Sequence, residues 1–373
     1  MFFYCLLLLP ILICNIRANA NFETGKSLLA NEPVGLPVFR NGESGYPCIR
    51  TPAIIKTNSS LLAFAGTRCG AGDGCNPHDA KTVDHMDTVM KRSMDNGKTW
   101  SSIRSIYSAS CEDRDHGTPV YDELRNRVVL VFRGKDLLTW TMYSDDDGET
   151  WSKPSQINLD KYNTSRVSPG RGLQLSSTNK HAPGRLVFVA QMGVKGRSSD
   201  IVYYSDDGGI TWRRSQSVID VGNEAQIVEL PNSTLLMNAR VEVKSKETSR
   251  LFAISDDGGV TWKTVSYRYD IAAVTCMGST ISTLDSSGKP ILLYSHPASM
   301  RKPRRDGAVW ISEDEGTSWS HFKSVNKGKG TLFAYSCMSE TMKPDTIGLL
   351  YETEDPSRCD GPSCQILYTE FQV

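Results

Sequence analysis

The sequence predicts an all-β protein folded as a six-bladed β-propeller, chiefly because one eight-residue motif recurs along the chain. The motif starts with Ser and has an acid at its third position, Gly at its fifth and Trp at its eighth. Its starts lie 50 to 61 residues apart. A period of about 55 residues is typical of stacked supersecondary units such as propeller blades. The copies are SMDNGKTW from Ser93, SDDDGETW from Ser144, SDDGGITW from Ser205, SDDGGVTW from Ser255 and SEDEGTSW from Ser312.

Each copy of the motif is predicted to form a hairpin turn. The carboxylate at the third position can accept hydrogen bonds from backbone N–H groups of the turn, and Gly supplies a positive φ. The Thr or Ser and the Trp that follow begin the returning strand and anchor it by packing. We therefore expect the acids of these motifs to be structural, with ligands bound at the other face of the propeller.

Short apolar runs between the motifs are predicted to be strands. They are four to seven residues long, rich in Val, Leu, Tyr and Phe, and bounded by turn-forming residues. No segment shows a sustained helical period. A closed ring of four-stranded sheets leaves few exposed edges, which explains how such a chain stays soluble. The clearest runs are RVVLVF (127–132), RLVFVAQ (185–191), TLLMNAR (234–240), PILLYS (290–295) and TIGLLYE (346–352).

Residues 1–20 are predicted to be a secretory signal peptide, because a run of large apolar residues ends in the small-residue pattern Ala18-Asn19-Ala20. About 353 residues then remain, enough for six blades of about 55 residues. We expect residues 21–373 to form one domain, reaching the extracellular space or the lysosome through the secretory pathway. Sequons at Asn58, Asn163 and Asn232 fit a glycoprotein.

Eight cysteines follow the predicted signal peptide, and in an oxidising compartment they indicate disulfides. The sequence does not fix the pairing, although Cys69 with Cys75 and Cys359 with Cys364 are close enough to form local loops. We expect no metal site, because no pair of histidines accompanies these cysteines. Nothing in the sequence indicates a cofactor.

The charge balance is neutral, with 42 Lys and Arg against 42 Asp and Glu. This balance gives no sign of a nucleic-acid partner or of a charged membrane-binding surface. After the predicted signal peptide, no apolar stretch is long enough to span a bilayer. The oligomeric state cannot be read from the sequence.

Several segments resemble the exo-α-sialidases of the bacterial and lysosomal type, and the likeness extends over the whole mature chain. In that family the repeated turn motifs are called Asp boxes. YPCIRTPAI resembles the family's Phe/Tyr-Arg-Ile-Pro element, although Thr51 replaces its usual apolar residue. The resemblance implies the six-bladed sialidase fold and a site that binds sialic acid, with three arginines around the sugar's carboxylate. Arginine suits this role because its planar guanidinium binds a carboxylate with two hydrogen bonds.

The resemblance assigns those arginines to three distant segments. Arg50 comes from YPCIRTPAI and Arg240 from NEAQIVELPNSTLLMNAR. Arg304 comes from the segment before the last motif, where Arg301 and Arg305 are alternatives.

A tyrosine is the nucleophile that the family implies, because a carboxylate nucleophile would be repelled by the carboxylate of the substrate. FAYSCMSE matches the family's Ala-Tyr-Ser and gives Tyr335, while NEAQ gives Glu224 as the base that activates it. Glu352 in LLYE resembles the carboxylate that orients the first arginine, and an ordinary strand-end glutamate is the alternative.

The general acid/base is assigned to Asp73, which lies five residues after Arg68 as in the family. This loop is longer than usual and also offers Asp79, Asp84 and Asp87. SPGRGLQLS resembles a family strand and places Gln174 either near the substrate or in a structural role.

Together these features predict a secreted exo-α-sialidase that removes terminal sialic acids from glycoproteins, glycolipids and oligosaccharides with retention of configuration. Two alternatives remain: a trans-sialidase, and a propeller that binds sialylated glycans without turnover. The pair Tyr335 and Glu224 distinguishes the last one, because a lectin needs no activated nucleophile.

Overall fold

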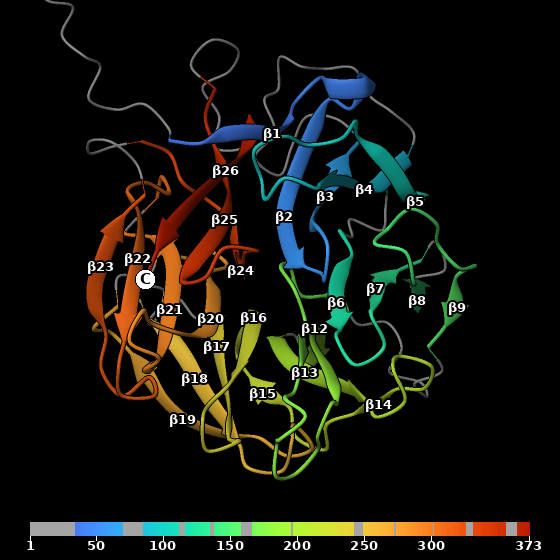
Figure 1. The fold of residues 1–373 in the computed structure, drawn as a ribbon. Coiled ribbons are helices and arrows are strands. Elements are labelled where there is room, and N and C mark those ends of the chain that lie inside the picture. Colours follow the sequence, from blue (N-terminus) through green and yellow to red (C-terminus); the bar gives the residue numbers. More distant parts are fainter. Residues whose placement is uncertain are drawn as a thin grey trace, which may run out of the picture. The chain divides into compact units, whose positions relative to one another are not determined.

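The predicted fold class is confirmed: nearly all regular structure in the computed structural model is β, in six sheets arranged as propeller blades (Figure 1). The only helix of the described residues is a single 3-10 turn, η1 (Glu43–Gly45), and no helix there could cross a membrane. The structure describes residues 34–69, 85–111, 116–134, 138–157, 166–194, 197–241, 249–271, 274–300, 302–325, 331–355 and 364–373.

Blades one to five are antiparallel sheets, each built from consecutive strands of the chain. Blade one contains β2 (Cys48–Lys56), β3 (Leu61–Arg68), β4 (His85–Ser93) and β5 (Arg104–Ser110). Blade two contains β6 (Thr118–Asp122), β7 (Arg127–Arg133), β8 (Thr139–Ser144) and β9 (Ser155–Gln156). Blade three has the same four positions, but its first and fourth strands are each divided in two. Its first strand is β10 (Arg166–Val167) and β11 (Leu173–Gln174), its second β12 (Leu186–Val194), its third β13 (Arg197–Ser205), and its fourth β14 (Arg213–Arg214) and β15 (Ile219–Asp220).

Blades four and five follow the same order. Blade four contains β16 (Gly222–Glu229), β17 (Leu235–Val241), β18 (Arg250–Ser255) and β19 (Lys263–Arg268). Blade five contains β20 (Ser279–Leu284), β21 (Pro290–Pro297), β22 (Gly307–Ser312) and β23 (Ser320–Ser324). The five apolar runs predicted from the sequence correspond to β7, β12, β17, β21 and β25, the second strands of blades two to six.

The two ends of the propeller chain close the ring in blade six. This sheet contains β24 (Ser336–Glu340), β25 (Thr346–Thr353) and β26 (Gln365–Gln372), and β1 (Leu36–Arg40) pairs with β26 as its fourth strand. The repeated motifs join the third and fourth strands of blades one to five. In blade six these two strands come from opposite ends of the chain, so no turn joins them. The count of five motifs in six blades follows from this closure.

The repeated motifs form the predicted hairpin turns. In the first, Asp95 accepts a bond of 2.8 Å from the Thr99 backbone and one of 2.6 Å from its hydroxyl. The Ser93 hydroxyl donates to Asp95 and accepts from the backbone N–H of Gly97. Gly97 itself has φ 84°. The same bonds recur in the other four motifs. These acids are used inside their own turns, in agreement with a structural role.

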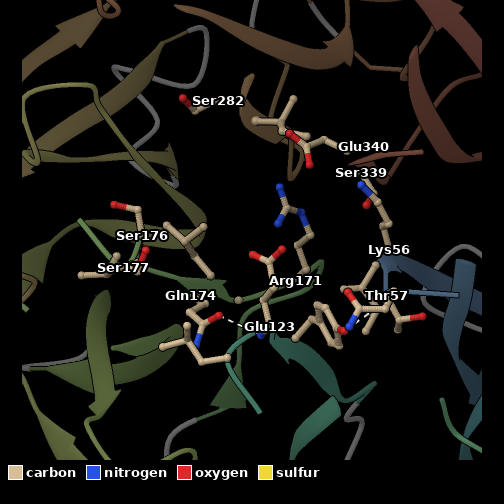
Figure 2. A pocket seen from close by; sticks show the side chains of 18 residues that line it. Lys56, Thr57, Glu123, Arg171, Gln174, Ser176, Ser177, Ser282, Ser339 and Glu340 are labelled. Atoms are coloured by element: carbon tan, nitrogen blue, oxygen red, sulfur yellow. Dashed lines mark hydrogen bonds between the residues drawn. The ribbon is translucent and has the colours of Figure 1, made fainter. Parts of the chain in front are cut away.

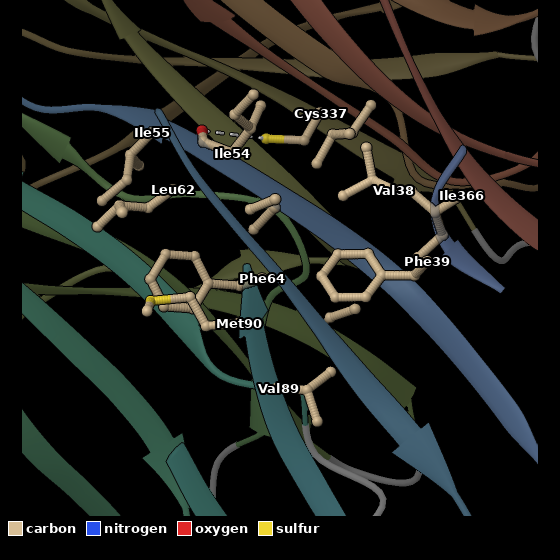
Figure 3. Close-up of a cluster of buried hydrophobic side chains, with 14 of the residues drawn as sticks. Val38, Phe39, Ile54, Ile55, Leu62, Phe64, Val89, Met90, Cys337 and Ile366 are labelled. Atoms are coloured by element: carbon tan, nitrogen blue, oxygen red, sulfur yellow. Dashed lines mark hydrogen bonds between the residues drawn. The ribbon is translucent and has the colours of Figure 1, made fainter. Parts of the chain in front are cut away.

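Hydrophobic clusters fill the space between neighbouring blades and hold the inner strands in place. The largest of them among the described residues extends over blades six, one and two, and in it Phe39, Phe64, Met90, Cys337 and Ile366 pack together (Figure 3). Eight of the nine residues of β2 are buried, because blades cover both of its faces. The inner strands follow one another around the ring, and β24 contacts β2 to complete it.

One disulfide corrects a sequence-based expectation. Cys69 is bonded to Cys111, with a Cα–Cα distance of 5.8 Å, and so does not form a local loop with Cys75. The bond joins the end of β3 to the residue after β5 within blade one. Sequence proximity suggested the wrong partner because sheet pairing brings distant strand ends together. Cys48 and Cys364 are also disulfide-bonded, while Cys276 and Cys337 are free and buried.

Candidate active site

A bulge at the start of β2 directs Arg50 toward a buried carboxylate. The register between β2 and β3 shifts between Arg50 and Ala53, and Thr51 has φ 57°. Arg50 donates to both carboxylate oxygens of Glu352, at 3.2 and 2.9 Å, and the Thr51 N–H adds a bond of 2.7 Å. Arg50 is 4% exposed and Glu352 is 0% exposed, so the arginine has little freedom to move. The Thr that departs from the family pattern therefore contributes its backbone to this contact.

A second bulge, in β16, turns Glu224 away from the regular strand pairing. The register with β17 shifts between Asn223 and Ala225, and Glu224 has φ 49°. A positive φ is costly for a residue with a side chain and is often found at functional sites. The carboxylate of Glu224 accepts a hydrogen bond of 2.6 Å from the phenol of Tyr335, the residue directly before β24.

Arg240 completes a three-residue contact with this pair. Its Nη1 donates to Glu224 at 2.5 Å and to the Tyr335 oxygen at 3.2 Å. Burial, and then the negative charge of Glu224, raise the pKa of the Tyr335 phenol well above its usual range, while Arg240 and Arg304 act to lower it. The resting phenol is therefore neutral, and it points its proton at the carboxylate of Glu224.

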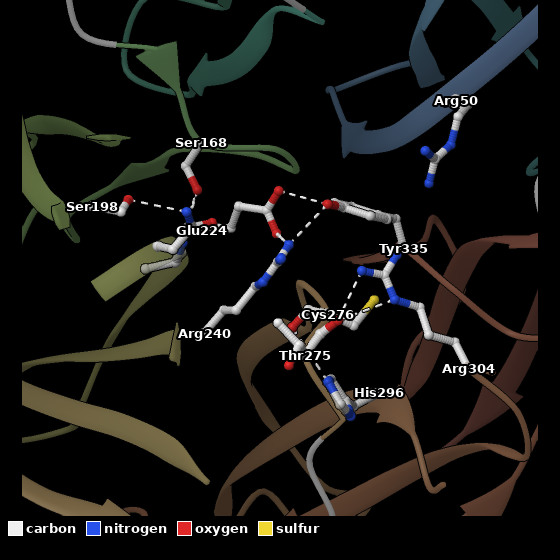
Figure 4. A network of polar contacts seen from close by, with 12 residues as sticks. Arg50, Ser168, Ser198, Glu224, Arg240, Thr275, Cys276, His296, Arg304 and Tyr335 are labelled. Atoms are coloured by element: carbon white, nitrogen blue, oxygen red, sulfur yellow. Dashed lines mark hydrogen bonds and ion pairs between the residues drawn. The ribbon is translucent and has the colours of Figure 1, made fainter. Parts of the chain in front are cut away.

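Arginines from three parts of the chain surround Tyr335 (Figure 4). The guanidinium carbons of Arg50 and Arg304 lie 5.3 and 5.2 Å from the centre of its ring. Arg304 is held by two bonds, 3.1 and 2.8 Å long, to the backbone oxygen of Thr275. Of the alternatives for this position, Arg305 forms a bridge with Leu332 through its backbone, and Arg301 lies outside the described residues.

The charges of this site are unbalanced among the described residues. Three guanidinium groups meet two carboxylates, those of Glu224 and Glu352, which leaves an excess of positive charge. A partly buried cluster of this kind favours an anionic ligand, since burial strengthens the attraction between opposite charges. Planar guanidinium groups are suited to a carboxylate in particular.

Known proteins resemble this chain over most of its length. The family described as BNR repeat-like domain matches residues 77–348, more than half of the chain. A curated sialidase from Bacteroides fragilis is 29% identical over 357 residues, covering 86% of this chain and 62% of that protein. The chain belongs to the sialidase family.

Other members show how far this likeness extends. A sialidase from Micromonospora viridifaciens is 29% identical, covering 91% of this chain and 55% of that protein. This sialidase-family chain thus spans about three fifths of the length of these two curated relatives. Solved structures share the fold: Hadza microbial sialidase Hz136 has a TM-score of 0.73 at 24% identity, covering 91% of this chain and 68% of that one. The intramolecular trans-sialidase from Ruminococcus gnavus has a TM-score of 0.69 at 20% identity, covering 91% and 98%.

Arg250 is a buried residue of this sialidase-family site that the sequence did not reveal. It lies on β18 opposite Arg240 and is 1% exposed. It donates to the Asn238 side chain and to the Cys276 backbone oxygen, both at 2.8 Å, and pairs with no carboxylate of the described residues. Burial lowers the pKa of its guanidinium. Arg250 thus holds Cys276 from one side, while the adjacent Thr275 holds Arg304.

Two further buried side chains, Arg68 and His116, lie near the first arginine. Both pack around Gly66, which pairs with Arg50 across β2 and β3: a Cβ built on Gly66 would lie 2.8 Å from His116 and 3.1 Å from Arg68. Gly66 was the available sequence signal for these two side chains, because a glycine inside a strand often marks a place where another group approaches the backbone closely.

The predicted general acid/base, Asp73, lies outside the described residues, as do the alternatives Asp79 and Asp84. The fourth candidate, Asp87, is described and is 4% exposed. It accepts a hydrogen bond of 2.5 Å from the hydroxyl of Tyr46. Burial and this bond raise the pKa of Tyr46 to about 12. Asp87 is therefore committed to a buried pair, which argues against it as the proton donor.

Of the two roles expected for Gln174, its contacts agree with the structural one. Its amide donates to Asp122 at 2.6 Å and accepts from the Glu123 N–H at 2.8 Å. These contacts hold the turn after β6. That turn lies at the end of the inner strands opposite Tyr335, so the spacing within SPGRGLQLS did not reveal which end of the blade Gln174 occupies.

Proposed function

We propose that this protein is an exo-α-sialidase that hydrolyses terminal sialic acids from glycans with retention of configuration. The observation that carries the proposal is the 2.6 Å hydrogen bond from Tyr335 to Glu224 in the middle of three arginines. Sialic acid has a carboxylate on its anomeric carbon. A site for its hydrolysis therefore needs cations for the carboxylate and a nucleophile that is not itself an anion.

Substrate binding is assigned to Arg50, Arg240 and Arg304, which would together bind the substrate carboxylate. Glu352 fixes the direction of Arg50 through two bonds, so this arginine is held in place before the substrate arrives. A fixed guanidinium loses less conformational freedom on binding than a mobile one. Bringing the carboxylate against these groups also places the anomeric carbon beside the Tyr335 oxygen.

The covalent step is assigned to Tyr335 and Glu224. The phenol oxygen forms a bond to the anomeric carbon as the bond from that carbon to the leaving oxygen breaks. The phenol proton passes to Glu224, which already accepts it in a hydrogen bond. In the second half of the reaction, water attacks the same carbon from the leaving-group side, and Glu224 returns the proton to the tyrosine. Two displacements at one carbon give net retention.

The general acid/base remains Asp73 as a proposal. It would protonate the departing glycan oxygen and then remove a proton from the attacking water. The roles proposed for the three arginines and for Tyr335 rest on contacts that do not involve Asp73, so they do not depend on this assignment.

Hydrolysis and transfer are distinguished by the acceptor. The same sialyl-tyrosine intermediate could pass its sugar to water or to another glycan, and a relative with the same fold is an intramolecular trans-sialidase. The test is turnover of 3′-sialyllactose followed by proton NMR. We expect free sialic acid released first as the α-anomer, with little transfer to added lactose. A first product of β configuration, or no turnover by the folded protein, would contradict the proposal.

We also propose that the chain enters the secretory pathway. The disulfide between Cys69 and Cys111 supports this, because such bonds persist mainly in oxidising compartments. Detection of the protein in the medium of expressing cells, cleaved after Ala20, is the measurement that checks it.

A further inference from the structure

A cavity lies at the end of the propeller opposite Tyr335. Its volume is about 290 Å³, and the ends of the inner strands β2, β6, β11, β20 and β24 contribute to its wall. Along β24 the chain runs from Tyr335 to Glu340, which lines this cavity. At about 3.3 Å per residue these positions are about 16 Å apart. The cavity is therefore separate from the candidate active site.

Arg171 occupies the middle of this cavity (Figure 2). It lies between β10 and β11, where the inner strand of blade three is interrupted. The two flanking glycines allow this segment to approach its neighbours closely: a Cβ on Gly170 would lie 2.0 Å from Gln226, and one on Gly172 2.6 Å from the Val187 oxygen. The packed segment fixes the backbone of Arg171 and directs its side chain into the open space.

The guanidinium of Arg171 is only partly used by the protein. Its Nε donates to the Met338 backbone oxygen at 3.1 Å, and its two terminal nitrogens have no partner among the described residues. Arginines elsewhere on the propeller behave differently. Arg127 and Arg185 each form two bonds with a carboxylate. Arg171 therefore retains the donors that a planar carboxylate needs.

The remaining lining combines one more cation with groups that bind hydroxyls. Lys56 supplies an ammonium group, and Ser282 and Ser339 supply hydroxyls. Glu123 and Glu340 also face the cavity, and neither forms an ion pair with Arg171 among the described residues. The charges of these two carboxylates balance those of Arg171 and Lys56. The carboxylates therefore disfavour a doubly charged ligand such as phosphate more than a singly charged one, and their oxygens are good acceptors for sugar hydroxyls.

We propose that this cavity binds a small, hydroxyl-rich monocarboxylate, with an acidic monosaccharide as the chemical class. The carboxylate would lie on Arg171 beside Lys56, and the hydroxyls would bond to Glu123, Glu340 and the serines. The volume is at the small end of the range for ligand pockets, which suits one sugar residue. The proposal concerns binding only and does not depend on the function proposed for Tyr335.

Isothermal titration calorimetry with D-glucuronate tests whether this cavity binds an acidic monosaccharide. Methyl β-D-glucuronide serves as the model of a glycan-linked residue. Binding of the free sugar alone would indicate a site for a monosaccharide, and binding of both a site for a glycan terminus. We expect Arg171→Met to weaken binding by about tenfold or more, because a charge-assisted bond is lost. Lys56→Met should weaken it less, and D-glucose should bind far more weakly than D-glucuronate.

The matched control is Lys289→Met, a lysine on the turn after β20 that pairs with Glu313 at 3.3 Å and does not line the cavity. It should leave the affinity unchanged. Ser282→Leu keeps the test decisive if Arg171→Met fails to fold, since it obstructs the cavity without removing a charge. Because Asn58 lines the cavity and begins a sequon, the titrations are repeated with Asn58→Gln.

Three results would overturn the proposal. The first is no binding of D-glucuronate at millimolar concentration by either the wild type or Asn58→Gln. The second is equal affinity in the wild type and in folded Arg171→Met or Ser282→Leu. The third is loss of binding in Arg240→Met with none in Arg171→Met, which would place the sugar in the candidate active site instead.

Discussion

The hydroxyl of Tyr335 donates a 2.6 Å hydrogen bond to Glu224, although the two residues are 111 positions apart in the sequence. Glu224 lies on the inner strand of blade four, and Tyr335 immediately precedes that of blade six. The closed ring brings both to the same end of the propeller, together with Arg240. A neutral phenol next to a carboxylate that can take its proton is the arrangement required of a tyrosine nucleophile.

Arg240→Lys should lower kcat/KM for a sialoside by about a hundredfold, because lysine keeps the charge but lacks the planar guanidinium that can form two hydrogen bonds with a carboxylate. The same change should lower kcat, since Arg240 also contacts Tyr335 and Glu224. Steady-state kinetics on a fluorogenic sialoside measures both effects. Kinetics equal to those of the wild type would remove Arg240 from the site.

Arg250→Met should reduce kcat/KM by about 10- to 100-fold, because loss of its bond to Cys276 frees the segment that holds Arg304. Arg250→Lys should restore part of the activity by returning a donor and a charge to this position. The matched control is Arg127→Met, which removes a surface ion pair with Asp145 and should not change the kinetics. An Arg250→Met protein with normal KM and kcat would show that this arginine serves the fold alone.

The repeated motifs were the strongest sequence signal for the fold, because each turn is built from residues within one short segment. Asp95, for instance, binds Thr99 four residues later. Spacing between such turns predicts blades without knowledge of any distant contact. Blade six has no such motif, because β1 and β26, its last two strands, come from opposite ends of the chain.

The candidate site was harder to predict, because its contacts join different blades. Local motifs pointed to Arg50, Arg240, Tyr335 and Glu224 only through resemblance to a family. Arg250 gave no such signal, since its partners Asn238 and Cys276 are reached through sheet pairing and a backbone oxygen. The pairing of Cys69 with Cys111 was missed for the same reason.

Asp257→Ala should destabilise the protein by about 1–3 kcal/mol while leaving catalysis per folded molecule nearly unchanged. Asp257 accepts bonds from Ser255 and Thr261 within its own turn, and none of these bonds joins it to a described residue of the candidate site. Denaturant unfolding and active-site titration measure the two quantities separately. A folded variant without turnover would contradict the structural role of these motifs.

Acid should weaken the propeller through the same turns. Hydrogen bonds from the hydroxyl and backbone N–H of Thr99 lower the pKa of Asp95 to about 2, and equivalent bonds from Thr150 lower the pKa of Asp146. A carboxyl group whose pKa is lower in the folded state stabilises the fold above its unfolded pKa, near 4. That contribution is lost as the pH falls toward about 2. The melting temperature should drop across this window, and Asp95→Asn should make the drop shallower. An identical pH profile in both proteins would contradict this.

Asp73→Ala should slow the cleavage of natural sialosides by about 10²- to 10⁴-fold, because a sugar hydroxyl is a poor leaving group that needs protonation. An aryl sialoside, whose leaving group is good, should be affected much less. Asp79→Ala and Asp84→Ala are the matched controls and should not depend on the leaving group. If one of them shows this dependence and Asp73→Ala does not, the acid/base is misassigned within the loop.

In the proposed reaction, Tyr335 attacks the anomeric carbon. A sialosyl fluoride with a second fluorine beside that carbon forms the covalent intermediate faster than it is hydrolysed, so the enzyme can be trapped and digested for mass spectrometry. We predict one sialyl group on the peptide that contains Tyr335, and none in the Tyr335→Phe protein. A sialyl group on Glu224 or any other residue, or full turnover by Tyr335→Phe, would show that Tyr335 is not the nucleophile.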